Sequence, residues 1–280
     1  MVNHTKLLGV MGWPVAHSLS PRLHQYWIEQ HKLNAVYLPL PVKPEDFADA
    51  LRALPKLGFS GVNVTIPHKE AACSLVDELT PEARRIGAVN TIIAAPDGRL
   101  TGANTDLFGF AENLRAAGYD IGGGAALVLG AGGAARAVLA ALRAGGCRRI
   151  ILTNRTPARA QALADSMGGA IEIIDWERRH ECLAETSLVV NTTSLGMEGQ
   201  EALMLDLTAM PPGGAVCDLV YKPLLTPLLR QAAARQLSAI DGLGMLLYQA
   251  QAAFRHWLGI MPEVTPMLRR HILAEPSSIR

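Results

Sequence analysis

Residues 126–136 read ALVLGAGGAAR, and this stretch decides how the fold is interpreted. Its four apolar residues predict a short buried strand, its glycines a tight turn, and Ala134–Leu142 an unbroken helix. A strand, a glycine-rich turn and a helix in this order make the glycine pattern a dinucleotide-site hypothesis. Gly130 and Gly132 let the backbone approach a pyrophosphate, and Ala135 is small enough for helix and strand to pack closely. An ordinary strand–helix turn is the alternative for this motif alone.

The next predicted strand, residues 149–153, is followed by Asn154-Arg155-Thr156. NAD sites usually have Asp or Glu at this place, where it binds the ribose 2′-hydroxyl. Here Arg155 takes that place, and Arg159 lies one turn into the following helix. Because guanidinium groups pair well with phosphate oxygens, the sequence predicts NADP rather than NAD. The alternative is a solvated pair of arginines at a helix start.

The composition narrows the class of protein. A chain of 280 residues, 49% apolar and 18% charged, is long enough for one large or two ordinary folded domains. A net charge of +1 gives no field suited to nucleic acid, and no apolar run is long enough to cross a bilayer. The first six residues lack a signal-peptide pattern, so we expect a cytoplasmic protein with no membrane partner. The scattered cysteines and histidines predict neither a disulfide framework nor a metal site.

Strands and helices alternate along the chain, which predicts an α/β protein with two domains. In the first part we expect strands over 7–12, 36–40, 61–66, 88–94 and 100–103, and helices over 21–33, 44–54 and 69–75. A helix over 105–117 bridges to a doubly wound, Rossmann-type domain. There we expect strands over 126–129, 150–153, 171–174, 188–191 and 215–219, and helices over 134–144, 157–167 and 226–235. The final helices, 244–258 and 262–273, could cap either domain.

Polar residues in the first part are placed for substrate binding. Ser18 and Ser20 precede Pro21, and in an extended backbone both hydroxyls would face one way and could hold a carboxylate. The alternative is that Ser20 caps the helix. Asn63 and Thr65 share one face of a strand that ends toward a predicted crevice.

Lys69 is expected to open a helix, where a cation is electrostatically unfavourable. A residue that breaks a local rule in this way is a candidate for function, although a surface lysine is the alternative. Asn90 opens a predicted strand. Asp106 opens the bridging helix, where a capping role is the alternative.

Seven motifs, taken in chain order, resemble those of shikimate dehydrogenases. They are His17–Pro21, Asn63–Lys69, Gly87–Thr91, Asn104–Asp106, Gly130–Ala134, Asn154–Thr156, and Asp241–Met245 with Gln249. The resemblance extends from about residue 8 to about residue 266 and is far more specific than any single motif. Trp13, Gln25 and Leu219 depart from the residues usual in that family.

The resemblance implies a role for each matched residue. Lys69 would transfer the proton, with Asp106 beside it. The substrate would be bound by Ser18, Ser20 and Tyr221 at its carboxylate and by Asn63, Thr65, Asn90, Asp106 and Gln249 at its hydroxyls. NADP would be bound by Gly130, Ala131, Gly132, Gly133 and Ala134, by Asn154, Arg155, Thr156 and Arg159, and by Thr192, Thr193, Leu219 and Gly242.

The activity implied is NADPH-dependent reduction of 3-dehydroshikimate to shikimate, a step toward chorismate and the aromatic amino acids. Residues 1–105 with 243–280 would form the mostly parallel substrate domain, onto which the final helices fold back, and residues 106–242 the NADP domain. We expect a monomer or homodimer without a metal. The nearest alternative is a quinate/shikimate dehydrogenase with broader substrate or NAD use. A silent nucleotide sensor would lack Lys69 or Asp106, and a folate-type dehydrogenase does not explain the two serines.

Overall fold

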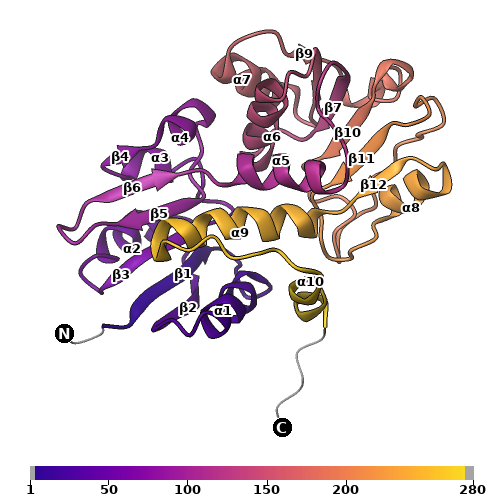
Figure 1. Cartoon of the computed structure of the whole chain (residues 1–280). Coiled ribbons are helices and arrows are strands. Elements are labelled where there is room, and N and C mark those ends of the chain that lie inside the picture. Colours follow the sequence, from indigo (N-terminus) through magenta and orange to yellow (C-terminus); the bar gives the residue numbers. More distant parts are fainter. Residues whose placement is uncertain (1–3, 275–280) are drawn as a thin grey trace. The chain divides into compact units, whose positions relative to one another are not determined.

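The computed structural model describes residues 4–274 (Figure 1). Met1–Asn3, which belong to the segment expected to lack a signal peptide, and residues 275–280 lie outside the described range. The chain divides into two compact units. The first comprises Met1–Thr105 with Leu247–Arg280, and the second comprises Asp106–Leu246.

The first unit is built on a six-stranded sheet in the order β2-β1-β3-β5-β6-β4. Its strands are β1 (Lys6–Gly12), β2 (Ala35–Pro41), β3 (Phe59–Val64), β4 (Glu78–Leu79), β5 (Thr91–Ala94) and β6 (Leu100–Ala103). β1 is parallel to β2 and β3, and β4 is parallel to β6, whereas β5 is antiparallel to both of its neighbours. The sheet is therefore mostly parallel, as predicted, because only the hairpin at Pro96–Gly98 reverses the chain directly.

The helices of the first unit come from two parts of the chain, its amino-terminal part and its end. The amino-terminal ones are α1 (Ser20–Gln30), the 3₁₀ turn η1 (Pro44–Asp46), α2 (Phe47–Ala53), α3 (Ala72–Leu75) and α4 (Pro81–Ile86). From the end of the chain come α10 (Pro266–Leu273) and the part of α9 (Gly242–Leu258) that begins at Leu247. The Trp257 indole donates a hydrogen bond of 2.8 Å to the Ile92 carbonyl of β5, and α9 runs beside this sheet in Figure 1. The expectation that the final helices fold back on the first domain is confirmed.

The second unit contains a fully parallel sheet in the order β12-β11-β10-β7-β8-β9. Its strands are β7 (Ala125–Leu129), β8 (Arg149–Thr153), β9 (Glu172–Ile173), β10 (Leu188–Asn191), β11 (Ala215–Asp218) and β12 (Ser238–Ile240). Its helices are α5 (Asp106–Ala116), α6 (Gly133–Ala144), α7 (Pro157–Met167) and α8 (Pro227–Ala234), with 3₁₀ turns η2 (Trp176–Arg178) and η3 (Leu183–Glu185). The order reverses between β7 and β10, and doubly wound sheets bind ligands at such a switch point.

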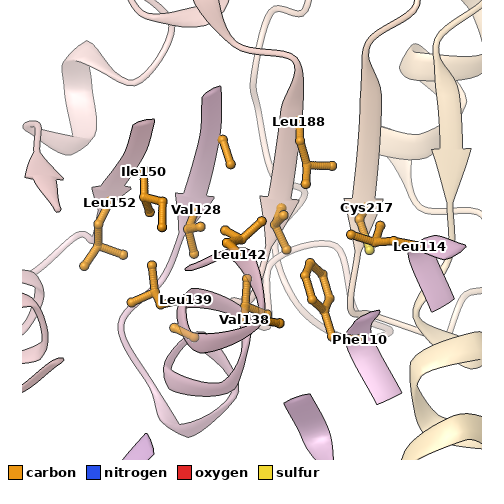
Figure 2. Packing of buried hydrophobic residues seen from close by; sticks show 14 of the residues in the cluster. Phe110, Leu114, Val128, Val138, Leu139, Leu142, Ile150, Leu152, Leu188 and Cys217 are labelled. Atoms are coloured by element: carbon orange, nitrogen blue, oxygen red, sulfur yellow. The ribbon is translucent and has the colours of Figure 1, made fainter. Parts of the chain in front are cut away.

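The core beneath this switch point is closely packed. Val138 and Leu142 of α6 and Phe110 of α5 are fully buried, and they pack with Val128 of β7 in one cluster (Figure 2). Burying such side chains contributes about 1.5–3 kcal/mol each, so this packing fixes the turn between β7 and α6.

Several predicted boundaries are wrong. The helix expected over 21–33 ends at Gln30, because Lys32 has a left-handed φ of 51°. The helix expected from 69 is only Ala72–Leu75, and the one expected from 262 begins at Pro266, capped by the Thr265 hydroxyl. β4, α4 and β12 were not predicted, although Thr80 before Pro81 is a typical helix start.

Candidate functional site

The two serines do not lie on an extended strand. Leu19 between them has helical angles, φ −82° and ψ −8°, so the period-two argument is wrong. The proposed cap by Ser20 is also wrong, because Ser20 is the first residue of α1. The Ser18 hydroxyl instead accepts the backbone N–H of Ser20 at 3.3 Å. The turn thus brings both residues together, with Ser20 buried and Ser18 half-buried.

A hydrogen-bonded network joins three predicted substrate residues of the first unit. Asn63, at the end of β3, donates to the carbonyl of Asn90 at 3.0 Å and to Thr91 Oγ1 at 3.1 Å. Asn90 Nδ2 donates to Gln249 Oε1 of α9 at 3.2 Å, and the Thr105 N–H donates to Asn90 Oδ1 at 2.8 Å. All five residues are buried. Strand ends far apart in the chain therefore present a fixed set of amide groups.

Thr65 follows β3 and is half-buried. Its backbone N–H donates to the Met11 carbonyl at 2.9 Å. A Cβ on Gly12 would lie 2.4 Å from Thr65 Cγ2, so Gly12 must remain glycine for the Thr65 side chain to keep its place.

Lys69 lies in a turn between β3 and α3 and does not open the helix, so the argument from the helix dipole is wrong. The turn is nevertheless well fixed. The Val89 N–H donates to the Lys69 carbonyl at 2.8 Å. The adjacent His68 ring stacks on Phe47 at 4.2 Å, and its Nε2 lies 2.7 Å from the Val42 carbonyl. Asp106 is buried at the first position of α5 in the second unit.

The glycine turn of the second unit follows β7. Gly130 has φ 106°, and its N–H donates to the Thr153 carbonyl at 2.8 Å. A Cβ there would lie 2.6 Å from Thr192 Oγ1, whereas a Cβ on Gly132 would meet nothing within 4 Å. Gly132 is exposed and precedes α6, whose first N–H groups have no partner within the helix. Ala131, Gly133 and Ala134 are half-buried around it. Open space at a helix N-terminus fits a pyrophosphate.

The residues predicted to select NADP lie at the β8–α7 junction. Asn154 Nδ2 donates to the Thr156 carbonyl at 2.9 Å, which orders the turn before α7. The Arg159 N–H donates to the same carbonyl at 3.0 Å. Arg155 and Arg159 are both exposed, so a phosphate could reach their guanidinium groups without displacing core residues.

A buried carboxylate organises the two turns predicted to flank the nicotinamide. Asp218 accepts hydrogen bonds from Thr226 Oγ1 at 2.7 Å, Asn191 Nδ2 at 2.8 Å and the Val220 N–H at 3.0 Å. Asn191 Oδ1 in turn accepts from Thr193 Oγ1 at 2.7 Å. Burial raises the pKa of Asp218. Sequence reasoning assigned no role to Asp218 or Asn191, because they meet only where β10 lies beside β11.

The remaining predicted residues lie on loops that follow the strands of the second unit or open α9. The Thr192 hydroxyl donates to the Leu129 carbonyl at 2.7 Å. A Cβ on Gly242 would lie 2.2 Å from the Leu219 carbonyl oxygen, so a glycine is required at the start of α9. Leu219 and Tyr221 are half-buried, and burial raises the pKa of the Tyr221 phenol.

Within residues 4–274, no three His, Cys, Asp or Glu side chains are grouped so that they could hold a metal ion. None of the helices in this range is both long and apolar enough to span a membrane.

Three family models match the chain. Residues 10–92 match the shikimate dehydrogenase substrate binding domain, 114–198 match shikimate/quinate 5-dehydrogenase, and 242–270 match the shikimate 5′-dehydrogenase C-terminal domain. A shikimate dehydrogenase (NADP(+)) of Paramagnetospirillum magneticum is 52% identical over 98% of this chain and 100% of its own.

Solved structures agree with this result. Shikimate 5-dehydrogenase of Thermus thermophilus, in complex with NADP(H) and shikimate, is 43% identical with a TM-score of 0.86, covering 95% of this chain and 99% of its own. Quinate dehydrogenase of Corynebacterium glutamicum, in complex with NAD, is 30% identical with a TM-score of 0.87. The match covers 96% of this chain and 97% of the quinate dehydrogenase chain.

Proposed function

The chain belongs to the shikimate dehydrogenase family, and we propose that it reduces 3-dehydroshikimate reversibly to shikimate with NADPH. The pathway served is the synthesis of chorismate and the aromatic amino acids, and we place the enzyme in the cytoplasm. The observation that carries the proposal is the buried network of Asn63, Asn90 and Gln249 on a chain that also has the glycine turn at a switch point. Amide groups in fixed positions suit a polyhydroxylated ring.

We assign substrate binding to residues 1–105 with 243–280, and NADP binding to residues 106–242. Ser18, Ser20 and Tyr221 would bind the carboxylate. Asn63, Thr65, Asn90, Asp106 and Gln249 would bind the ring hydroxyls. Support for the first group comes from the turn that joins Ser18 to Ser20, and support for the second from the network around Asn90.

Lys69 would supply the proton that the reaction requires. When NADPH is bound, it supplies the hydride to the ketone carbon, and negative charge develops on the oxygen. The Lys69 ammonium stabilises that oxygen and donates a proton from Nζ, and neutral Nζ takes the proton back in the reverse direction. Asp106 would orient and stabilise the ammonium.

The second unit fits NADP through three groups of residues. The turn over 130–134 would receive the pyrophosphate. The 2′-phosphate would be received by the half-buried Asn154 together with the exposed Arg155, Thr156 and Arg159. Thr192, Thr193, Leu219 and Gly242 would flank the nicotinamide. The open space at Gly132 and the exposure of both guanidinium groups support this assignment.

A substrate panel tests the proposal. Purified protein is expected to oxidise shikimate with NADP⁺ far faster than quinate with either cofactor, measured by absorbance of the reduced cofactor. Quinate has an additional hydroxyl at the carbon that carries its carboxylate, so the region of Ser18, Ser20 and Tyr221 decides between the two acids. Equal rates with quinate and NAD⁺ would favour a quinate/shikimate dehydrogenase, the alternative suggested by the Corynebacterium structure.

Arg155→Ala is expected to raise the KM for NADP⁺ about tenfold or more and to leave the KM for NAD⁺ within about twofold, because it removes a charge-assisted contact to the 2′-phosphate only. The measurement is steady-state kinetics with each cofactor at saturating shikimate. Arg178→Ala is the matched control, since Arg178 is an exposed arginine of the same unit paired with Glu181. Equal loss with both cofactors would refute the assignment.

A further inference from the structure

Tyr37 of β2 is a buried tyrosine that no motif identified. Its hydroxyl donates a 2.7 Å hydrogen bond to Asn63 Oδ1. Its ring stacks on the buried His24 ring of α1, with centroids 4.2 Å apart and planes 6° from parallel. The stack holds the phenol in one orientation, so its hydroxyl meets Asn63 at a fixed place.

The orientation of the Asn63 amide follows from its partners. Nδ2 has two hydrogens, and it donates to the Asn90 carbonyl and to Thr91 Oγ1. Turning the amide over would place Oδ1 against the Asn90 carbonyl oxygen, which cannot donate. Oδ1 must therefore face Tyr37, and with both N–H groups occupied Asn63 can offer a ligand only an acceptor.

The bond between Tyr37 and Asn63 is shielded from water. Tyr37, Asn63 and Thr91 are all buried, so water does not compete for the Asn63 amide or for the phenol.

His24 places no charge beside the bond between Tyr37 and Asn63. Both of its ring nitrogens are buried, and neither has a hydrogen-bond partner within the described part of the chain. Burial lowers the pKa of His24 to about 3, partly opposed by the polar Asn63 side chain, so the ring is neutral at physiological pH. Phe254 of α9 lies nearly parallel to the same ring, with centroids 6.0 Å apart, so an apolar ring follows the imidazole in the stack.

We propose that Tyr37 is a positioning residue: its hydroxyl holds Asn63 Oδ1, which the Asn90 carbonyl restricts to the acceptor role, in place to accept from one ring hydroxyl of the substrate. The inference rests on the proposed function, because it assumes that Asn63 contacts the substrate. It adds a specificity rule: the hydroxyl that meets Asn63 must donate, so a ligand with only an acceptor at that place binds poorly.

The test is Tyr37→Phe, which keeps the ring that stacks on His24 and removes only the hydroxyl. We expect the KM for shikimate to rise about five- to thirtyfold, with the KM for NADP⁺ within about twofold of wild type. Tyr26→Phe is the matched control, because Tyr26 lies on α1 and its hydroxyl accepts from the exposed Gln30. If Tyr37→Phe acted only by loosening the fold, the KM values for shikimate and for NADP⁺ would both rise and the melting temperature would fall. That result would contradict a positioning role.

Analogues of shikimate that each lack one unreactive ring hydroxyl complete the test. The penalty of Tyr37→Phe is expected to vanish for the analogue whose missing hydroxyl meets Asn63 and to persist for the other. An equal penalty on every analogue, or an unchanged shikimate KM, would overturn the inference. If Tyr37→Phe does not fold, Thr91→Val removes the acceptor on the other side of the Asn63 amide and is expected to raise the shikimate KM in the same way. A wild-type protein inactive on shikimate would instead refute the proposed function.

Discussion

Replacing Lys69 with alanine is expected to lower kcat for shikimate oxidation about 100-fold or more, while the KM for shikimate stays within about twofold. The reason is that Nζ would act on an oxygen whose charge develops only in the transition state, so its loss affects turnover more than binding. Lys69→Arg should be about as inactive, because a guanidinium keeps the charge but does not lose its proton.

The measurement is steady-state kinetics with purified variants at saturating NADP⁺. Lys56→Ala is the control, since Lys56 is an exposed lysine on the loop before β3. The fold should survive in every variant, because the Lys69 turn is held by its backbone bond to Val89 and by the His68 stack, which do not use the Lys69 side chain. A large rise in KM with normal kcat would reassign Lys69 to binding.

The elements with strong local signals could be predicted from the sequence. Strand β10 and helix α7 have the predicted bounds, because apolar runs and a proline at the helix start are local features. The helix expected at Lys69 was wrong, because the His68 N–H donates to the Thr65 carbonyl and the Val89 N–H donates to the Lys69 carbonyl, which hold this segment in turns. The hydrogen bond from Val89 is a tertiary interaction, and helix propensity, which depends only on the local sequence, does not predict it.

The candidate site likewise contains some residues that local sequence could predict and others that depend on tertiary contacts. The glycine turn and the arginines after β8 could be found because each is one short stretch of chain. Tyr37 and Asn63 are 26 residues apart, and Asn191 and Asp218 are 27 apart. Only the pairing of β1 with both β2 and β3, or of β10 with β11, brings such residues together. Supporting residues of this kind become visible only once the sheet register is known.

Gly130→Ala is expected to lower the free energy of unfolding by about 3 kcal/mol and to raise the KM for NADP⁺ more than about tenfold. Two effects add. At φ 106° a side chain strains the backbone, and the new Cβ would lie 2.6 Å from Thr192 Oγ1 and 2.9 Å from Thr193 Cγ2. Thr192 cannot easily withdraw, because its hydroxyl donates to the Leu129 carbonyl.

Two further glycine variants separate strain, collision and cofactor binding. Gly146 has a φ of 79° and open space around it. Gly146→Ala should therefore cost only about 1 kcal/mol of strain and leave the kinetics unchanged.

Gly132→Ala introduces neither strain nor collision, so its stability should stay within about 0.5 kcal/mol of wild type. Its KM for NADP⁺ should still rise about tenfold or more, because the Cβ would occupy the space left for the pyrophosphate. Chemical denaturation and steady-state kinetics on the three variants measure both quantities. A Gly132→Ala enzyme that binds NADP⁺ normally would show that the pyrophosphate lies elsewhere.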